Sequence, residues 1–246
     1  MLDFIKSLLR WVESFLTALV RLASKHPFDT AKYRFNFPEV WYSPWRSDPA
    51  FQSIYRRISA NTLISERKLF DLLSLAKQVR GFSATRVLEI GTYKGGSGAL
   101  LAQVLPDAQL TLWDNWGKPV TGDDYFVKKV YAEDSDLSRA QALVKSIGTP
   151  SALACEYVCE LFPNEQILAA HEGEYSLVHF DIYDENAFAN GIALVWPKLC
   201  TGGMFICGGY GAISLDKLTE AINRFIEANA CTFVQTQSGM GVLIKR

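Results

Sequence analysis

A short apolar segment followed by a glycine-rich turn constrains the fold of this chain more than any other sequence feature. Residues 86–90 are typical of a buried strand, and residues 91–98 form a turn before a predicted helix over Ala99–Val104. A strand that turns sharply into a helix points unpaired backbone N–H groups and the positive end of the helix dipole at a ligand. Gly91 and Gly95 are expected to let that ligand approach the backbone, because glycine has no Cβ.

An acid at the end of the predicted strand indicates the kind of ligand. The spacing Glu89-x-Gly91-x-x-x-Gly95 differs from the Gly-x-Gly-x-x-Gly pattern that binds an anionic pyrophosphate. A carboxylate here suits a ligand with a cationic group, such as the amino-acid part of S-adenosylmethionine. The next predicted strand ends at Asp114, at the spacing where such sheets place the acid that binds ribose hydroxyls. We therefore expect a methyltransferase more than a dehydrogenase.

The composition sets broad limits. The chain has 246 residues, enough for one large α/β domain with an appendage, and its net charge of −1 gives no reason to expect nucleic acid as a partner. The five cysteines form no Cys-x-x-Cys pair and lie mostly in apolar segments, which favours reduced thiols and a cytoplasmic location.

Strands that alternate with helices predict a mostly parallel sheet. A final pair of strands around residues 238–241 predicts an antiparallel edge. The predicted strands are 86–90, 109–113, 152–158, 175–180, 204–207, 231–235 and 242–245, and the helices after residue 60 are 65–79, 99–104, 165–170, 186–195 and 215–228.

The N-terminal sixty residues are expected to form a separate segment, with the ligand-binding domain at 61–246. Residues 2–24 have the pattern of an amphipathic helix whose charges exclude a membrane span. We expect this helix to pack on its own domain or to form a homodimer. Residues 26–60 are rich in aromatic residues and proline, and are expected to be irregular.

Five segments carry a family resemblance: Asn61–Arg67, Val87–Ser97, Leu112–Pro119, Val178–Tyr183 and Pro197–Gly203. They resemble class I S-adenosylmethionine-dependent methyltransferases, and among them the macrocin O-methyltransferase type. The resemblance covers residues 55–246. It implies a Rossmann-like fold, S-adenosylmethionine as methyl donor with S-adenosylhomocysteine as product, and a natural-product or sugar acceptor.

One departure from the family concerns a metal. Members of this type carry Asp-Asp-Tyr-Gly after the fifth strand, where the acids help to hold a divalent cation. Here the same positions are Gly208-Gly209-Tyr210-Gly211, and the fourth strand ends in one aspartate, Asp181. Magnesium needs several oxygen ligands, so we predict no metal site.

Acids at the carboxyl end of a strand in an open α/β sheet face the ligand crevice. Asp181 is therefore the expected base or acceptor-orienting residue, His179 can share its face of the strand, and Tyr210 follows the fifth strand. For His179 a structural role in the core is the stronger interpretation. The predicted catalytic residues are Asp181, His179 and Tyr210, and the predicted cofactor-binding residues are Thr62, Ser65, Glu89, Gly91, Thr92, Gly95, Gly96, Ser97, Asp114 and Asp181.

The leading hypothesis is an enzyme that transfers a methyl group from S-adenosylmethionine to a hydroxyl or amine of a small molecule without a metal. Three alternatives stay open. The protein can bind the cofactor and catalyse a different reaction, act as a non-enzymatic partner subunit, or, as a distant fourth hypothesis, be a dehydrogenase.

Overall fold

The structure is a computed structural model that describes residues 43–82, 86–117, 135–212 and 215–246. The chain divides into two compact units, residues 1–47 and 48–246. The predicted amphipathic helix over residues 2–24 lies outside the described residues. All described strands belong to the second unit. The assignment of residues 1–60 to a separate segment stays a prediction.

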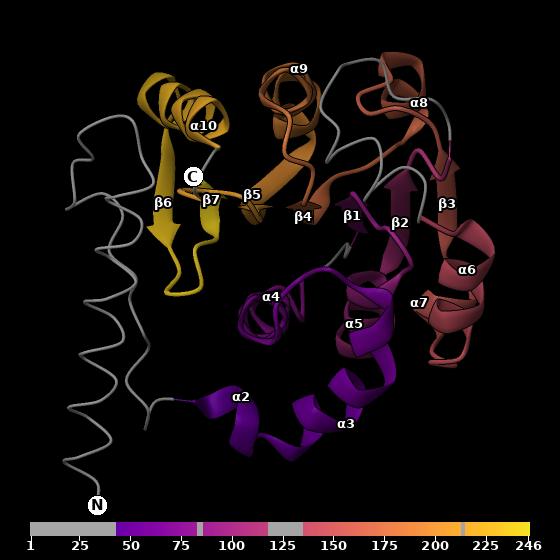
Figure 1. Ribbon diagram of the computed structural model, residues 1–246. Helices are drawn as coiled ribbons and strands as arrows, with labels where there is room; N and C mark the ends of the chain where they lie inside the picture. Colours follow the sequence, from indigo (N-terminus) through magenta and orange to yellow (C-terminus); the bar gives the residue numbers. More distant parts are fainter. Residues whose placement is uncertain (1–42, 83–85, 118–134, 213–214) are drawn as a thin grey trace, which may run out of the picture. The chain divides into compact units, whose positions relative to one another are not determined.

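The second unit is built on a seven-stranded sheet in the order β3-β2-β1-β4-β5-β7-β6 (Figure 1). The five strands from β3 to β5 run parallel, and β7 is antiparallel to both β5 and β6. This arrangement confirms the predicted mostly parallel sheet with an antiparallel C-terminal edge. The strands are β1 (Arg86–Ile90), β2 (Gln109–Asp114), β3 (Glu156–Cys159), β4 (Tyr175–Phe180), β5 (Leu199–Cys207), β6 (Cys231–Gln235) and β7 (Gly241–Lys245).

Helices cover both faces of this sheet. Figure 1 shows α8, α9 and α10 on one face and α4 and α5 on the other, where α4 and α3 each pack against α5. The helices of the second unit are α3 (Pro49–Ile58), η1 (Ser59–Asn61), α4 (Glu66–Gln78), α5 (Gly96–Val104), α6 (Leu137–Lys145), α7 (Pro150–Leu153), α8 (Glu165–Ala170), α9 (Glu185–Val195), η3 (Trp196–Lys198) and α10 (Asp216–Ala228), and a short α2 (Pro44–Ser47) precedes them in the first unit.

Helix-capping signals explain two differences from the sequence predictions. The segment expected to be irregular contains α3, which begins after Asp48, whose Oδ1 accepts a hydrogen bond from the N–H of Phe51. The predicted strand over 152–158 is wrong in its first half. Thr149 caps the short helix α7 and Pro150 occupies its first position, so that β3 begins only at Glu156.

The fifth strand is longer than expected. It begins at Leu199 and not at Met204, because the glycine pair 202–203 continues the strand. The pairing of β4 with β5 shifts register between Tyr175 and Leu177, and Gly202 has a φ of +78° at this irregularity. A glycine pair in a strand marks such a bulge as readily as it marks a turn.

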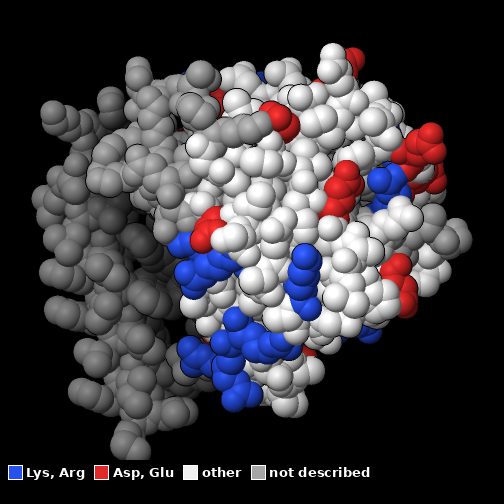
Figure 2. Space-filling view, turned by 90° about the vertical axis from the view of Figure 1, so that its right-hand side faces the viewer, with Lys and Arg blue, Asp and Glu red and all other residues white. Residues whose placement is uncertain are grey.

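Charges of both signs lie on the surface of the described residues. In the view of Figure 2, Lys and Arg gather in the lower half of the face, while Asp and Glu lie mainly toward its right side and top. No helix among the described residues is both long enough and apolar enough to cross a membrane. The expectation that nucleic acid is not a partner stays a prediction.

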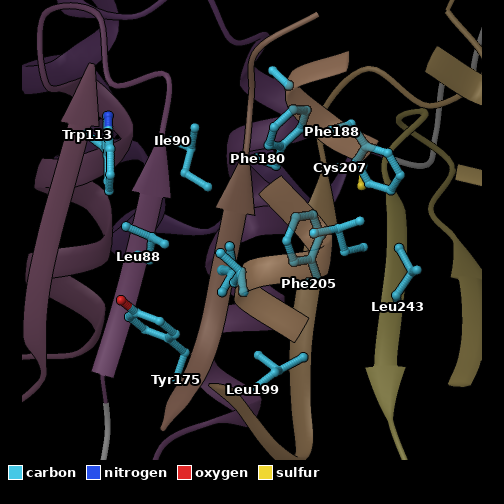
Figure 3. Packing of buried hydrophobic residues seen from close by; sticks show 14 of the residues in the cluster. Leu88, Ile90, Trp113, Tyr175, Phe180, Phe188, Leu199, Phe205, Cys207 and Leu243 are labelled. Carbon is cyan, nitrogen blue, oxygen red and sulfur yellow. The ribbon is translucent and has the colours of Figure 1, made fainter. Parts of the chain in front are cut away.

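The core between the sheet and α8–α10 is rich in aromatic side chains. Phe180, Phe188 and Phe205 pack against one another with ring centroids 5.7–6.0 Å apart (Figure 3). Leu88 and Ile90 of β1 face the same core. Because successive side chains of a strand alternate between faces, the intervening Glu89 points to the opposite face, toward α4 and α5. Glu89 is an acid in the buried part of β1, so its carboxylate needs a hydrogen-bonding partner.

Candidate functional site

The carboxyl ends of the parallel strands meet at one edge of the sheet. The chain runs outward from β1 to β2 and β3, then returns to β4, which pairs with the other side of β1. Ligands of open α/β sheets bind at such a reversal of strand order. The acids at this edge are Glu89 on β1, Asp114 at the end of β2 and Asp181 directly after β4.

Glu89 is paired with His179 inside the sheet. The two residues are direct neighbours in the register of β1 and β4, and His179 Nδ1 lies 3.0 Å from Glu89 Oε1. Neither side chain has exposed surface. Burial lowers the pKa of His179, but the hydrogen bond to Glu89 and the charges of Asp181 and Glu89 outweigh it, so that the pKa is raised above 6.5. His179 thus holds the Glu89 carboxylate, and its predicted catalytic role stays a prediction.

The second oxygen of Glu89 is the atom of the site that most clearly needs a ligand. Oε2 is buried and has no hydrogen-bond partner among the described residues. A buried polar atom without a partner costs about 1–3 kcal/mol, and more when it is charged. A Cβ built on Gly98 would lie 3.1 Å from Oε2, so the carboxylate borders the first turn of α5. A cationic group at this place would satisfy it.

The first turn of α5 favours a negatively charged group, whereas Glu89 favours a positively charged one. Its N-cap is Gly95, with φ +86° and no side chain that can cap the helix. By contrast, α3, α4, α6, α7, α8 and α9 each begin with a side chain that accepts from the first turn. Uncapped N–H groups and the helix dipole favour an anion. Glu89 and α5 together therefore match a ligand that carries an ammonium and a carboxylate, as an amino acid does.

Asp114 fastens the glycine turn to the end of β2. Its Oδ2 accepts from the N–H of Tyr93 at 2.7 Å, and its Oδ1 accepts from the N–H of Trp116 at 3.2 Å. Trp116 Nε1 in turn donates to the carbonyl of Tyr93 at 2.8 Å. Burial raises the pKa of Asp114, against the effect of these N–H donors. Each carboxylate oxygen can accept more than one hydrogen bond, so Asp114 retains the capacity to bind ribose hydroxyls.

Asp181 lies beside a lysine that the sequence reasoning did not identify. Lys68, on the first turn of α4, donates from Nζ to the carbonyl of Gly208 at 2.6 Å. Burial lowers its pKa, and the nearby charge of Asp181 raises it in part. Burial also raises the pKa of Asp181, against the effects of His179 and Lys68. In the sequence, Lys68 has the pattern of a solvent-facing residue, and only the packing of α4 reveals its position.

The glycines of the turn lie close to other segments of the chain. A Cβ on Gly91 would lie 2.8 Å from the carbonyl oxygen of Asp181, and one on Gly95 would lie 2.8 Å from Ala140 Cα. A Cβ on Gly96 would lie 2.6 Å from Thr62 Cβ. Protein atoms occupy the space in which a Cβ of each glycine would lie. These glycines allow chain segments to pack closely around the turn, and the contact of the cofactor with them stays a prediction.

The predicted hydroxyl ligands of the cofactor have local roles in the structure. Thr62 Oγ1 accepts from the N–H of Ile64, and Ser65 Oγ caps α4 by accepting from the N–H of Lys68. Thr92 and Ser97 are buried, and Thr92 Oγ1 has no hydrogen-bond partner among the described residues. A buried hydroxyl without a partner favours a ligand contact for Thr92, and the cofactor contacts of all four residues stay predictions.

Tyr210 is engaged by neighbouring elements. Its hydroxyl donates to Asn223 Oδ1 on α10 at 3.0 Å, and its ring packs on Phe233 of β6 with centroids 4.9 Å apart. These contacts support a packing role, and its predicted catalytic role is untested. Within the described parts of the chain, no group of three or more His, Cys, Asp and Glu side chains could hold a metal ion; the prediction of a metal-free site stays a prediction.

The comparisons with known proteins concern the fold. No family model matches the chain, and a search of curated proteins gives no match. The chain is similar in structure to the O-methyltransferase NovP, at 14% identity and a TM-score of 0.58, with 75% of this chain and 82% of that one covered. The S-adenosylhomocysteine-bound methyltransferase PaMTH1 of Podospora anserina matches at 14% identity and a TM-score of 0.56, covering 80% and 88%.

A third similar structure is the O-methyltransferase TomG of Streptomyces achromogenes in complex with S-adenosylmethionine. It matches at 19% identity and a TM-score of 0.51, with 81% of this chain and 91% of that one covered. At these identities the likeness establishes the fold alone. The chain has the Rossmann-like sheet and flanking helices of these methyltransferases.

Proposed function

We propose that this protein transfers the methyl group of S-adenosylmethionine to a small-molecule acceptor. The observation that carries the proposal is the buried, unpartnered Oε2 of Glu89 beside the uncapped first turn of α5. This pair of features fits the ammonium and carboxylate of the methionine part. Asp114, at the end of the neighbouring strand, is suited to the ribose hydroxyls. The similar structures PaMTH1 and TomG hold S-adenosylhomocysteine and S-adenosylmethionine.

S-adenosylmethionine supplies an activated methyl group on a sulfonium centre. The task of the protein is then to hold donor and acceptor in line and to accept a proton. Glu89 binds the ammonium and is held by His179, Asp114 orients the ribose, and α5 receives the carboxylate. Asp181, at the end of β4, is the acid closest to the acceptor side of the site in this arrangement.

We propose that the reaction needs no metal. The acid that would hold a cation, Asp181, has the Lys68 ammonium as a neighbour, and the two positions after β5 are glycines. A hard dication needs several oxygen ligands, whereas a lysine ammonium already partly balances this carboxylate. We further propose a natural-product or sugar acceptor, as in the macrocin type, a cytoplasmic location and a homodimer. The five cysteines are all unpaired, which agrees with the proposed location.

Calorimetric titration combined with methyl transfer tests the proposal. Wild-type protein should bind S-adenosylmethionine and S-adenosylhomocysteine, and should transfer label from methyl-labelled S-adenosylmethionine to a component of a small-molecule extract. Glu89→Gln should weaken the binding of both nucleosides, because it removes the charge opposite the ammonium. Exposed Glu227 on α10 gives a matched control, and Glu227→Gln should bind as the wild type does. Absence of binding to the wild-type protein would refute the proposal.

A further inference from the structure

The two glycines after β5 provide space for side chains of the segment that follows β4. A Cβ on Gly208 would lie 1.9 Å from Asp181 Oδ1, and a Cβ on Gly209 would lie 2.8 Å from Tyr183 Cδ1. The carboxylate of Asp181 and the ring of Tyr183 therefore occupy the places that any larger residues at these positions would need. Gly208 and Gly209 thus leave the room in which the side chains of Asp181 and Tyr183 lie.

The ammonium group of Lys68 contacts Gly208 and is a positive charge near Asp181. Lys68 reaches from α4 to the carbonyl of Gly208, and its ammonium is close enough to Asp181 for each to shift the pKa of the other. An ammonium has three N–H donors, and the Gly208 carbonyl uses one of them. Donors therefore remain for Asp181 and for a bound ligand. His179 is close enough to this ammonium for Lys68 to lower its pKa, and His179 directs its Nδ1 to Glu89.

The positive charge of Lys68 favours a hydroxyl acceptor over an amine acceptor. A hydroxyl oxygen becomes negative as it loses its proton, and a neighbouring ammonium stabilises that charge. An amine acceptor instead becomes positive as it gains the methyl group, so the same ammonium opposes its reaction. A carboxylate with a raised pKa is also a better proton acceptor than an ordinary aspartate.

We propose that Lys68 and Asp181 together activate a hydroxyl acceptor; this inference rests on the proposed methyl transfer. Asp181 accepts the proton of the hydroxyl while the ammonium of Lys68 donates a hydrogen bond to the same oxygen. The new bond joins this oxygen to the methyl carbon as the bond from carbon to sulfur breaks, and the electron pair stays on sulfur. The products are a methyl ether and neutral S-adenosylhomocysteine, and Asp181 releases the proton to solvent.

The test compares Lys68→Met with wild type and with Lys77→Met, which removes an exposed lysine of the same helix. Calorimetry with S-adenosylhomocysteine measures the cofactor site. Single-turnover transfer from methyl-labelled S-adenosylmethionine to a small-molecule extract measures the chemistry, and mass spectrometry of the product locates the methyl group. The melting temperature of each variant shows whether it is folded.

Lys68→Met should bind S-adenosylhomocysteine within about twofold of wild type and transfer the methyl group on the order of 100-fold more slowly, the usual effect of removing one donor to an oxyanion. Lys77→Met should match wild type in both measurements. Lys68→Arg should restore part of the rate, because a guanidinium keeps the positive charge and N–H donors, and the product should be an O-methyl compound. Equal rates for Lys68→Met and wild type, or an N-methyl product, would overturn the inference while leaving the proposed function intact. A wild-type protein that transfers no methyl group would remove the proposed function and this inference with it.

Discussion

Replacing Gly91 by alanine tests whether this glycine serves packing or ligand access. The residue has a φ of +90°, where an L-residue is strained by about 1–2 kcal/mol. The added Cβ would also lie 2.8 Å from the carbonyl oxygen and 2.9 Å from the carbonyl carbon of Asp181. Backbone atoms cannot turn aside as a flexible side chain can, so overpacking adds about 1–3 kcal/mol. The total expected loss of unfolding free energy is about 2–5 kcal/mol.

Gly148 offers a matched control. Its φ is +76°, and a Cβ there would meet no atom of the described residues within 4 Å. Gly148→Ala therefore carries the backbone strain without the collision, and the reduced entropy of the unfolded chain is common to both variants. The difference between the two variants isolates the overpacking at Gly91, about 1–3 kcal/mol. For a chain of this size that corresponds to roughly 2–12 °C in melting temperature.

Urea unfolding of the wild type and both variants measures these losses, and calorimetry with S-adenosylhomocysteine follows the ligand. We expect Gly91→Ala to be the less stable variant. Equal stability of Gly91→Ala and Gly148→Ala, with cofactor binding weakened only by Gly91→Ala, would refute the packing explanation. That result would instead support the role in ligand access that the sequence alone predicts for Gly91.

Three further predictions concern the strand ends. Glu89→Gln should weaken S-adenosylmethionine binding about 10- to 150-fold in calorimetry, the loss of one charged hydrogen bond of about 1.5–3 kcal/mol; unchanged affinity would contradict it. His179→Leu should lower the unfolding free energy by about 3–5 kcal/mol in urea at pH 6, because it leaves Glu89 buried without its partner. Since folding raises the pKa of His179, its stabilising contribution is complete below 6.5 and is lost as the pH rises through the folded pKa, so the difference between wild type and His179→Leu should shrink above pH 6.5. Gly208→Ala should slow methyl transfer while S-adenosylhomocysteine still binds, because its Cβ displaces the Asp181 carboxylate; a wild-type rate would show that the position of this carboxylate does not matter.

The sequence predicted the elements whose patterns are local. β1, β4, α4 and α8 have strong apolar patterns, and their predicted bounds agree with the structure to within a residue or so. The predictions were wrong at two places where a helix cap, and not an apolar pattern, determines the secondary structure. Asp48-Pro49 and Thr149-Pro150 start helices, but each pair is also typical of a turn.

The sequence predicted only those residues of the candidate site whose position depends on a single strand end. Glu89 and Asp114 follow from spacing along the chain, and both lie at the expected edge of the sheet. The bond between Glu89 and His179 depends on the register of β1 with β4, which no local pattern gives. Lys68 depends on how α4 lies across the ends of β4 and β5, and its contact with Gly208 joins residues 140 positions apart in the sequence.

The structure of the protein bound to S-adenosylhomocysteine tests the central claim most directly. We predict that the amino group of the nucleoside lies within hydrogen-bond distance of Glu89 Oε2, its carboxylate at the first-turn N–H groups of α5, and its ribose hydroxyls at Asp114. A ligand bound at another edge of the sheet, or an amino group that leaves Oε2 unpaired, would contradict it.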